Sequence, residues 1–313
     1  VLESLKVWGP HSHSTLAMTL PEAQAYCRQL ALGHYENFPV VTWLLPRDVR
    51  PHFYSIYAYC RWSDDLADEI SDPAESLRLL DWWENQLLAC YQRIHEHRTQ
   101  LNDLRTETGF VHPVFVALEH SILACSLPIE PFRDLLSAFR QDQNRHQYES
   151  FDDLQNYCRR SADPVGRLIL HVCGLANPDN FALSDSICTG LQLANFWQDI
   201  SRDADRGRTY LPREDRKRFG YSDSNLAERK TNAAFVELMK FEVERARRLL
   251  LDGRPLVDRF PRRMKFDIEM FIRGGLCILD RIQQQNFSVW GWRPKLNKSD
   301  FLQIAWHSLR RLL

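Results

Sequence analysis

The stretch from Gln192 to Asp203 constrains the fold of this chain most, because its polar residues recur at helical spacing. At about 100° per residue, a helix gathers four of them into an arc of about 80°. These four are Gln192, Asn195, Asp199 and Asp203. Asp199 and Asp203 lie four positions apart, where like charges repel and weaken an isolated helix. A hard divalent cation such as Mg²⁺, which prefers oxygen ligands, removes this penalty. A solvated acidic face is the alternative for a single pair.

A second stretch, residues 57–69, repeats the arrangement. On a helix its polar residues share an arc of about 60°. They are Tyr57, Arg61, Asp64 and Asp68. Two such helices can face each other across a cavity, where their four aspartates would repel one another without bound cations. The two stretches together therefore predict a divalent-cation site.

The composition describes a soluble globular protein. Of the 313 residues, 44% are hydrophobic and 26% are charged, which is enough for a sizeable core. The net charge of −1 gives no general attraction to nucleic acid or to anionic lipid. Eight scattered cysteines without a Cys-x-x-Cys pair indicate reduced thiols in the core rather than disulfides or a zinc site. No apolar run reaches the ~18 residues that span a bilayer, and no signal peptide opens the chain. The expected location is cytoplasmic.

The rest of the chain reads as helices separated by Pro and Gly, so we expect one all-α domain over residues 1–313. Only 12 glycines are present, which favours helices over turn-rich sheets. Residues 1–19 are expected to be irregular, and Ala162 to Gly166 should break a helix. The predicted helices cover residues 21–32, 48–69, 128–146, 184–204, 232–252 and 263–285.

A C-terminal amphipathic helix is predicted over residues 299–313, with Ser299 at its start. Its apolar residues are Phe301, Leu302, Ala305, Trp306, Leu309, Leu312 and Leu313. We expect it to pack onto the other helices. Peripheral contact with the inner membrane surface is the alternative.

The motifs resemble those of the squalene and phytoene synthase group of trans-isoprenyl diphosphate synthases. The resemblance extends to His34, Phe38, Tyr157 and Gly166. It is carried by Tyr57-x-x-Cys60-Arg61-x-x-Asp64-Asp65-x-x-Asp68, by Gln192-x-x-Asn195-x-x-x-Asp199-x-x-x-Asp203 and by Arg206-Gly207-Arg208-Thr209-Tyr210-Leu211-Pro212.

This resemblance implies an isoprenoid synthase bundle of helices around a central cavity, with Mg²⁺ ions and a prenyl diphosphate between two aspartate-rich walls. The implied metal ligands are Asp64, Asp68, Asn195, Asp199 and Asp203. The implied diphosphate-binding residues are His34, Arg61, Gln192, Arg206 and Arg208. Tyr57, Tyr157 and Tyr210 match tyrosines of the family's cavity and, with Arg61, are the implied catalytic residues. Such rings stabilise a carbocation or pass a proton. A core role with a satisfied hydroxyl is the alternative for each tyrosine.

The sequence also departs from the family pattern. Many members read Arg-Asp-x-x-Glu-Asp in the second motif, whereas Gln198 and Arg202 stand here. Tyr35 and Asn37 replace serines that dehydrosqualene synthases carry after the histidine. These changes weaken the case for a second prenyl diphosphate site and favour an enzyme that needs only one.

The segments around His34 and Asn195 look most like bacterial hydroxysqualene synthases of the hopanoid pathway. In that interpretation presqualene diphosphate loses diphosphate, and water captures the rearranged cation as hydroxysqualene. One alternative is a condensing synthase that joins two farnesyl or geranylgeranyl diphosphates into presqualene diphosphate, dehydrosqualene or phytoene. The other is a non-catalytic relative that acts as an assembly or binding protein. Downstream pathway enzymes are candidate partners.

Overall fold

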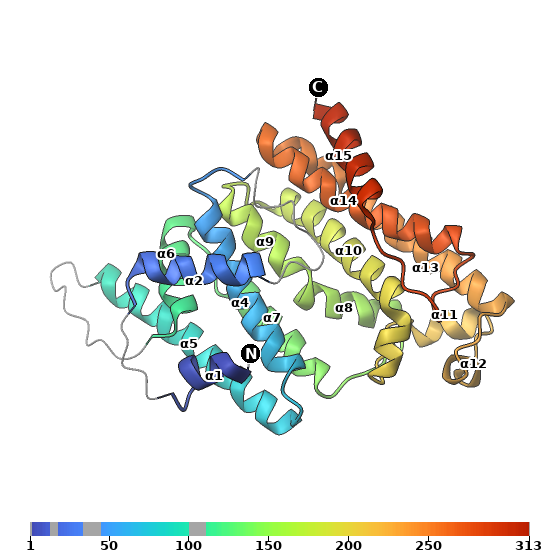
Figure 1. Ribbon diagram of the computed structural model, residues 1–313, viewed down its shortest axis with the longest axis horizontal. Coiled ribbons are helices and arrows are strands. Elements are labelled where there is room, and N and C mark those ends of the chain that lie inside the picture. Colours follow the sequence, from blue (N-terminus) through green and yellow to red (C-terminus); the bar gives the residue numbers. More distant parts are fainter. Residues whose placement is uncertain (1, 13–17, 34–44, 100–110, 313) are drawn as a thin grey trace. The chain divides into compact units, whose positions relative to one another are not determined.

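The computed structural model describes residues 2–12, 18–33, 45–99 and 111–312. Within these ranges the chain forms helices and no strand (Figure 1). One isolated bridge pairs Gln147 with Thr209. The predicted all-α class is therefore confirmed.

The chain divides into two compact units. The first comprises residues 1–144 and 168–174, and the second comprises residues 145–167 and 175–313. The expectation of a single domain over residues 1–313 stays a prediction.

The first unit is built around a central helix, α4. Its helices are α1 (Leu2–Trp8), α2 (Leu20–Gly33), α4 (Arg50–Asp68), α5 (Pro73–Thr99), α6 (Pro113–Cys125) and α7 (Glu130–Asp142). Helix α4 packs against α2, α5, α6 and α7. Pro51 lies in the first turn of α4. Proline has no backbone N–H group, and the N–H groups of a first turn have no partner within the helix, so proline suits this position.

Large aromatic side chains hold α4 in the first unit. Trp62 of α4 stacks on Trp83 of α5 with 5.3 Å between the ring centroids. Tyr59 meets Phe132 of α7 edge to face at 4.9 Å. His112 is fully buried among these rings and caps α6 by accepting a hydrogen bond from the Val114 amide. Burying this apolar face leaves the polar face of α4 for the first aspartate motif.

The second unit is built around α10. Its helices are α8 (Phe151–Ser161), α9 (Asp163–Val172, which ends in the first unit), α10 (Pro178–Asp205), α11 (Arg213–Arg218), α12 (Asp223–Ala227), α13 (Ala233–Asp252), η1 (Arg254–Arg259), α14 (Arg262–Gln284) and α15 (Lys298–Leu312). Helix α10 packs against α8, α13, α14 and η1.

Close packing of α10 on α13 fixes the orientation of the second motif. A Cβ atom at Gly190 would lie 2.9 Å from Cγ of Leu250, so the two helices approach closely because Gly190 has no side chain. Trp197 is fully buried and donates a hydrogen bond from its indole nitrogen to the Glu242 carbonyl oxygen at 3.1 Å. Phe196 and Ile200 are buried with it. The amide and carboxylate stripe lies opposite Gly190 and Trp197 on α10, and Phe196 and Ile200 lie beside it.

Most predicted helices match elements of the structure. Helices α2, α4, α7, α10, α13 and α14 cover the predicted ranges with shifted ends. The predicted break is confirmed, because α8 ends at Ser161 and α9 begins at Asp163. The expectation of an irregular segment over residues 1–19 is wrong for Leu2–Trp8, which is helical.

The C-terminal helix also begins earlier than predicted. It starts at Lys298, and its cap is Asn297, whose side-chain oxygen accepts a hydrogen bond from the Asp300 amide at 2.9 Å. Helix α15 packs on α14 through Ile304 and Ser308, which are buried. Leu302 and Trp306 remain 74% and 55% exposed. Among the described residues, no helix combines the length and the apolar character needed to cross a membrane.

Candidate functional site

The second motif forms a stripe of oxygen donors along the last turns of α10. Asn195, Asp199 and Asp203 follow at intervals of four residues, and Gln192 precedes them. Asn195 is exposed, Asp203 is half-buried, and the side chain of Asp199 is only 14% exposed. An amide and two carboxylates are the ligand types that a hard cation such as Mg²⁺ prefers.

Asp199 is already engaged by arginine side chains. The Arg293 guanidinium holds both carboxylate oxygens, with Nε at 2.5 Å from Oδ1 and Nη2 at 2.9 Å from Oδ2. Arg202 adds a more distant contact, with its Nε 3.9 Å from Oδ1, and its own side chain is mostly exposed. The bidentate arrangement is the strong form of a charge-assisted pair. Arg293 lies between α14 and α15, 94 positions from Asp199, so no local motif predicts this contact.

Gln198, a departure from the family pattern, binds the same connecting segment. Its Nε2 donates a hydrogen bond to the Pro294 carbonyl oxygen at 2.5 Å. Two consecutive residues of α10, Gln198 and Asp199, therefore hold two consecutive residues of the segment that leads to α15.

A tight turn after α10 carries the two predicted diphosphate-binding arginines. The backbone amides of Arg206 and Arg208 both donate to the Asp203 carbonyl oxygen, at 3.0 and 2.8 Å. Gly207 between them has a φ of +72°, a conformation that favours glycine. Arg208 and Asp203 then line one pocket, whereas Arg206 is exposed.

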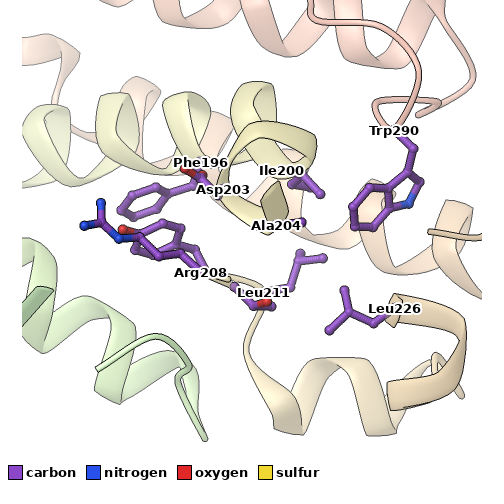
Figure 2. Close-up of a pocket in the computed structure, with 10 residues that line it drawn as sticks. Phe196, Ile200, Asp203, Ala204, Arg208, Leu211, Leu226 and Trp290 are labelled. Atoms are coloured by element: carbon purple, nitrogen blue, oxygen red, sulfur yellow. The ribbon is translucent and has the colours of Figure 1, made fainter. Parts of the chain in front are cut away.

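This pocket has a polar side and an apolar side. Figure 2 shows Phe196, Asp203 and Arg208 grouped together, and Ile200, Leu226 and Trp290 on the other side. Thr209, Tyr210 and Leu211 complete the lining with Ala204.

An aromatic cluster brings two of the predicted tyrosines together. Tyr210 stacks on Phe196 with centroids 3.7 Å apart, and Tyr157 of α8 lies 6.1 Å from Tyr210. Tyr148 joins them 5.8 Å from Tyr210 and carries the Arg145 guanidinium over its ring at 4.9 Å. Sequence reasoning missed Tyr148, because it lies in a connection without a motif. Tyr157 is buried and Tyr210 is half-buried.

On α4 of the first unit, Arg61 is bound to aspartates of its own motif. Its Nη2 lies 2.5 Å from Asp65 Oδ1, and its Nη1 lies 3.6 Å from Asp64 Oδ2. Asp65 is buried, whereas Asp64 is half exposed and Asp68 is exposed. The middle aspartate of the motif thus positions Arg61, and the outer two remain at the surface. Sequence reasoning did not assign this role to Asp65.

In the first motif, burial and neighbouring charges have opposite effects on the pKa values of Arg61 and Asp65. Burial raises the pKa of Asp65, and Arg61 partly opposes the rise. Burial alone would lower the pKa of Arg61, but Asp65 and Asp64 outweigh it and raise that pKa. Burial also raises the pKa of Tyr57, whose side chain is partly exposed at the same face. Arg61 therefore stays a fixed cation beside the outer aspartates.

The structure thus gathers the predicted residues into two sets. Tyr57, Arg61, Asp64 and Asp68 share α4, and the predicted residues between Tyr157 and Tyr210 lie in the second unit. His34, Tyr35, Asn37 and Phe38 lie outside the described residues. In the ranges that the structure covers, no three His, Cys, Asp or Glu side chains form a ready-made metal site.

The sequence of this chain matches one family of known proteins. Residues 17–300 match the family model described as squalene/phytoene synthase. A phytoene synthase of Arthrospira platensis is 30% identical over 92% of this chain and 93% of its own length. A hydroxysqualene synthase of Rhodopseudomonas palustris is 34% identical over 71% of this chain and 70% of its own.

A solved structure shares the fold as well. The squalene synthase HpnC of Alicyclobacillus acidocaldarius superposes with a TM-score of 0.78 at 39% identity. The match covers 87% of this chain and 97% of that protein.

Proposed function

We propose, because this chain belongs to the squalene/phytoene synthase family, that it is a hydroxysqualene synthase. In this reaction presqualene diphosphate and water give hydroxysqualene and diphosphate. The carbon–oxygen bond to diphosphate breaks, the cyclopropylcarbinyl cation rearranges, and water forms the new carbon–oxygen bond and releases a proton. Members of this family process prenyl diphosphates. The conversion of presqualene diphosphate to hydroxysqualene is what we propose for this chain.

The observation that carries the proposal is the 34% identity with the hydroxysqualene synthase of Rhodopseudomonas palustris over 71% of this chain. The 39% identity with squalene synthase HpnC supports a role in squalene chemistry. The second motif supports it. The family's Arg and Glu positions are occupied by Gln198 and Arg202, which face Pro294 and Asp199 in this structure. A reaction with one diphosphate substrate does not need the groups that bind a second one.

The diphosphate is proposed to lie between the two motifs, with Mg²⁺ held by carboxylate and amide oxygens. The proposed ligands are Asp64, Asp68, Asn195, Asp199 and Asp203. When bound, such ions neutralise the leaving diphosphate and lower the barrier to its departure. The stripe on α10 fits this role by its chemistry, since its side chains are carboxylates and amides, and both offer oxygen atoms to a cation.

Arginines of the chain are proposed to hold the phosphate oxygens. Arg61 is fixed by Asp65, so its charge is oriented before substrate arrives. Arg208 lies beside Asp203 in the pocket, and Arg206 precedes it in the same turn. Gln192 extends the stripe as an amide donor. Guanidinium groups match phosphate geometry, which favours these positions for anchoring the diphosphate.

The aromatic cluster is proposed to stabilise the cation that forms after diphosphate leaves. Tyr157, Tyr210 and Phe196 present adjacent rings within the second unit. The negative face of an aromatic ring attracts a cation. Tyr57 of the first motif is proposed to take part from α4, as a ring or as a proton carrier.

A condensing synthase is the second candidate, because the phytoene synthase of Arthrospira platensis matches 92% of this chain. Purified protein with Mg²⁺ should be given presqualene diphosphate or farnesyl diphosphate in separate reactions, and the products identified by mass spectrometry. Hydroxysqualene from presqualene diphosphate alone supports the proposal. Presqualene diphosphate, dehydrosqualene or phytoene formed from linear precursors supports a condensing synthase. Absence of turnover with both supports a non-catalytic assembly or binding protein.

Helix α15 supports a further proposal, peripheral contact with a membrane surface. Leu302, Trp306 and Leu309 are exposed at i, i+4 and i+7. Arg310 lies over the Trp306 ring at 5.0 Å, and Lys298 is exposed at the start of the helix. Apolar side chains beside basic groups suit an anionic bilayer surface.

A further inference from the structure

We propose that Arg293 is a built-in counter-ion of Asp199 that competes with the divalent cation and leaves the carboxylate when the cation binds. The inference rests on the proposed function, because that function assigns Asp199 as a cation ligand. It adds Arg293 as a positioning residue that sets how readily this ligand becomes available.

The first observation is the geometry of the pair formed by Arg293 and Asp199. Arg293 contacts both oxygens of Asp199, at 2.5 and 2.9 Å, and the side chains are only 19% and 14% exposed. Solvent therefore screens this pair less than it screens pairs at the surface. The guanidinium and a divalent cation on the same carboxylate would repel each other within a few ångströms. A cation bound directly to Asp199 therefore requires Arg293 to withdraw.

The second observation is the chain segment that contains Arg293. Residues 290–294, here called the strap, form the middle of the connection between α14 and α15. Gln198 holds the strap at the Pro294 carbonyl oxygen, directly beside the Arg293 contact. At its other end Trp290 lies 5.6 Å from Phe235 and lines the pocket that contains Asp203. Withdrawal of Arg293 therefore disturbs a segment that carries two tryptophans, Trp290 and Trp292.

The two positions that depart from the family pattern gain a role from this arrangement. Gln198 is neutral, so it anchors the strap without adding a charge beside Asp199. Arg202 lies 3.9 Å from the same carboxylate, on the solvent side. Asp199 therefore rests between a largely buried arginine and an exposed one.

The test measures Mn²⁺ binding without substrate, by the electron paramagnetic resonance signal of free Mn²⁺. The variants are Arg293→Gln and Arg293→Lys, with Lys295→Gln as the matched control. Lys295 is an exposed cation in the adjoining stretch, so its loss changes the charge by the same amount. We expect Arg293→Gln to bind Mn²⁺ about tenfold more tightly than wild type. Arg293→Lys should fall between the two, because lysine keeps the charge and loses the fork.

A second readout separates competition from a merely structural role. Mn²⁺ should change the tryptophan fluorescence of wild type and of Lys295→Gln. It should change that of Arg293→Gln much less, because the strap is already released. Asp199→Asn should lose the Arg293-dependent difference in affinity. Circular dichroism verifies that each variant is folded.

Mn²⁺ affinity that is equal or weaker in Arg293→Gln than in wild type would overturn the inference. If wild type still binds Mn²⁺ through Asp199 and converts presqualene diphosphate in that case, the proposed function stands. If wild type and Arg293→Gln both fail to bind Mn²⁺, this inference falls together with the cation role of Asp199.

Discussion

Asp267 of α14 is a buried carboxyl group whose two oxygens have no hydrogen-bond partner among the described residues. Asp267 is only 3% exposed, and burial raises the pKa of its carboxyl group from 3.8 to about 7. Because the folded-state pKa is raised, its contribution to stability is complete below pH 4. That contribution is lost as the pH rises through 7, at a rate of up to about 1.4 kcal/mol per pH unit.

Asp267→Asn should therefore stabilise the protein at pH 8 by about 2 kcal/mol and have little effect at pH 4.5. Urea denaturation at the two pH values measures the difference. Asp252→Asn, at the exposed end of α13, is the control and should leave the difference between the two pH values as it is in wild type. Lower stability of Asp267→Asn at pH 8 would mean that the carboxylate has a favourable role there.

The outer aspartates of the two motifs should be needed for turnover. We expect Asp64→Asn and Asp199→Asn each to lower kcat at least about 100-fold, because an amide cannot supply the negative charge that a cation requires. Steady-state kinetics with Mg²⁺ measure the loss, and circular dichroism should show the helical fold retained. Asp179→Asn, at the exposed start of α10, is the control. Near-normal rates in either variant would remove that residue from the chemistry.

At this scale the sequence predicts which residues share a helix face but not what each side chain contacts. The spacing of Asp64 and Asp68 follows from helix geometry alone. The pairing of Asp65 with Arg61 depends on the burial of Asp65, which local spacing does not give. Arg293 reaches Asp199 across 94 positions, and only tertiary packing brings them together.

At the scale of elements, α10 approaches α13 closely at Gly190. Replacing this glycine by alanine should therefore destabilise the protein, although the same change usually stabilises a helix. Alanine normally favours a helix over glycine by about 1 kcal/mol. At Gly190 the added Cβ would lie 2.9 Å from Leu250 Cγ and 3.1 Å from its backbone nitrogen. Gly190→Ala should therefore destabilise the protein by about 1–2 kcal/mol, measured by thermal unfolding.

Gly33→Ala is the matched control, because nothing lies within 4 Å of a Cβ atom at that position. It should be neutral or slightly stabilising. If Gly190→Ala is also neutral, α10 and α13 can separate without cost, and the packing argument for the orientation of α10 fails.

Helix α15 carries the prediction about membrane contact. Leu302→Asp with Trp306→Asp should weaken flotation with anionic vesicles at least about tenfold, because two exposed apolar side chains are lost from the contact surface. Gln303→Asp, at an exposed polar position, is the control. Equal vesicle binding by the double variant would remove α15 from any membrane contact.

Helix positions were largely predictable, because apolar periodicity and proline mark them locally. Helix α4 was expected over residues 48–69 and runs from Arg50 to Asp68. The helix at Leu2–Trp8 was missed because its support is tertiary. Trp8 lies 6.0 Å from Tyr26 and 6.2 Å from His112, both distant in sequence. In α15 the buried residues Ile304 and Ser308 were not the predicted apolar face, since packing on α14 selects the face.

At the scale of the whole molecule, the two aspartate motifs belong to different compact units. Each motif is complete within its own helix, α4 or α10. Their joint use is part of the proposed function, which rests on the family match and on the mutual repulsion of four aspartates without cations. Helix geometry alone cannot supply this step, because it relates only residues of the same helix.

The most direct test of this central claim is anomalous diffraction at the manganese edge from crystals grown with Mn²⁺ and inorganic pyrophosphate. We predict Mn²⁺ sites that contact pyrophosphate oxygens together with Asp64 or Asp68 of α4 and with Asn195, Asp199 or Asp203 of α10. Manganese bound to only one of the two motifs, or away from both, would contradict the account.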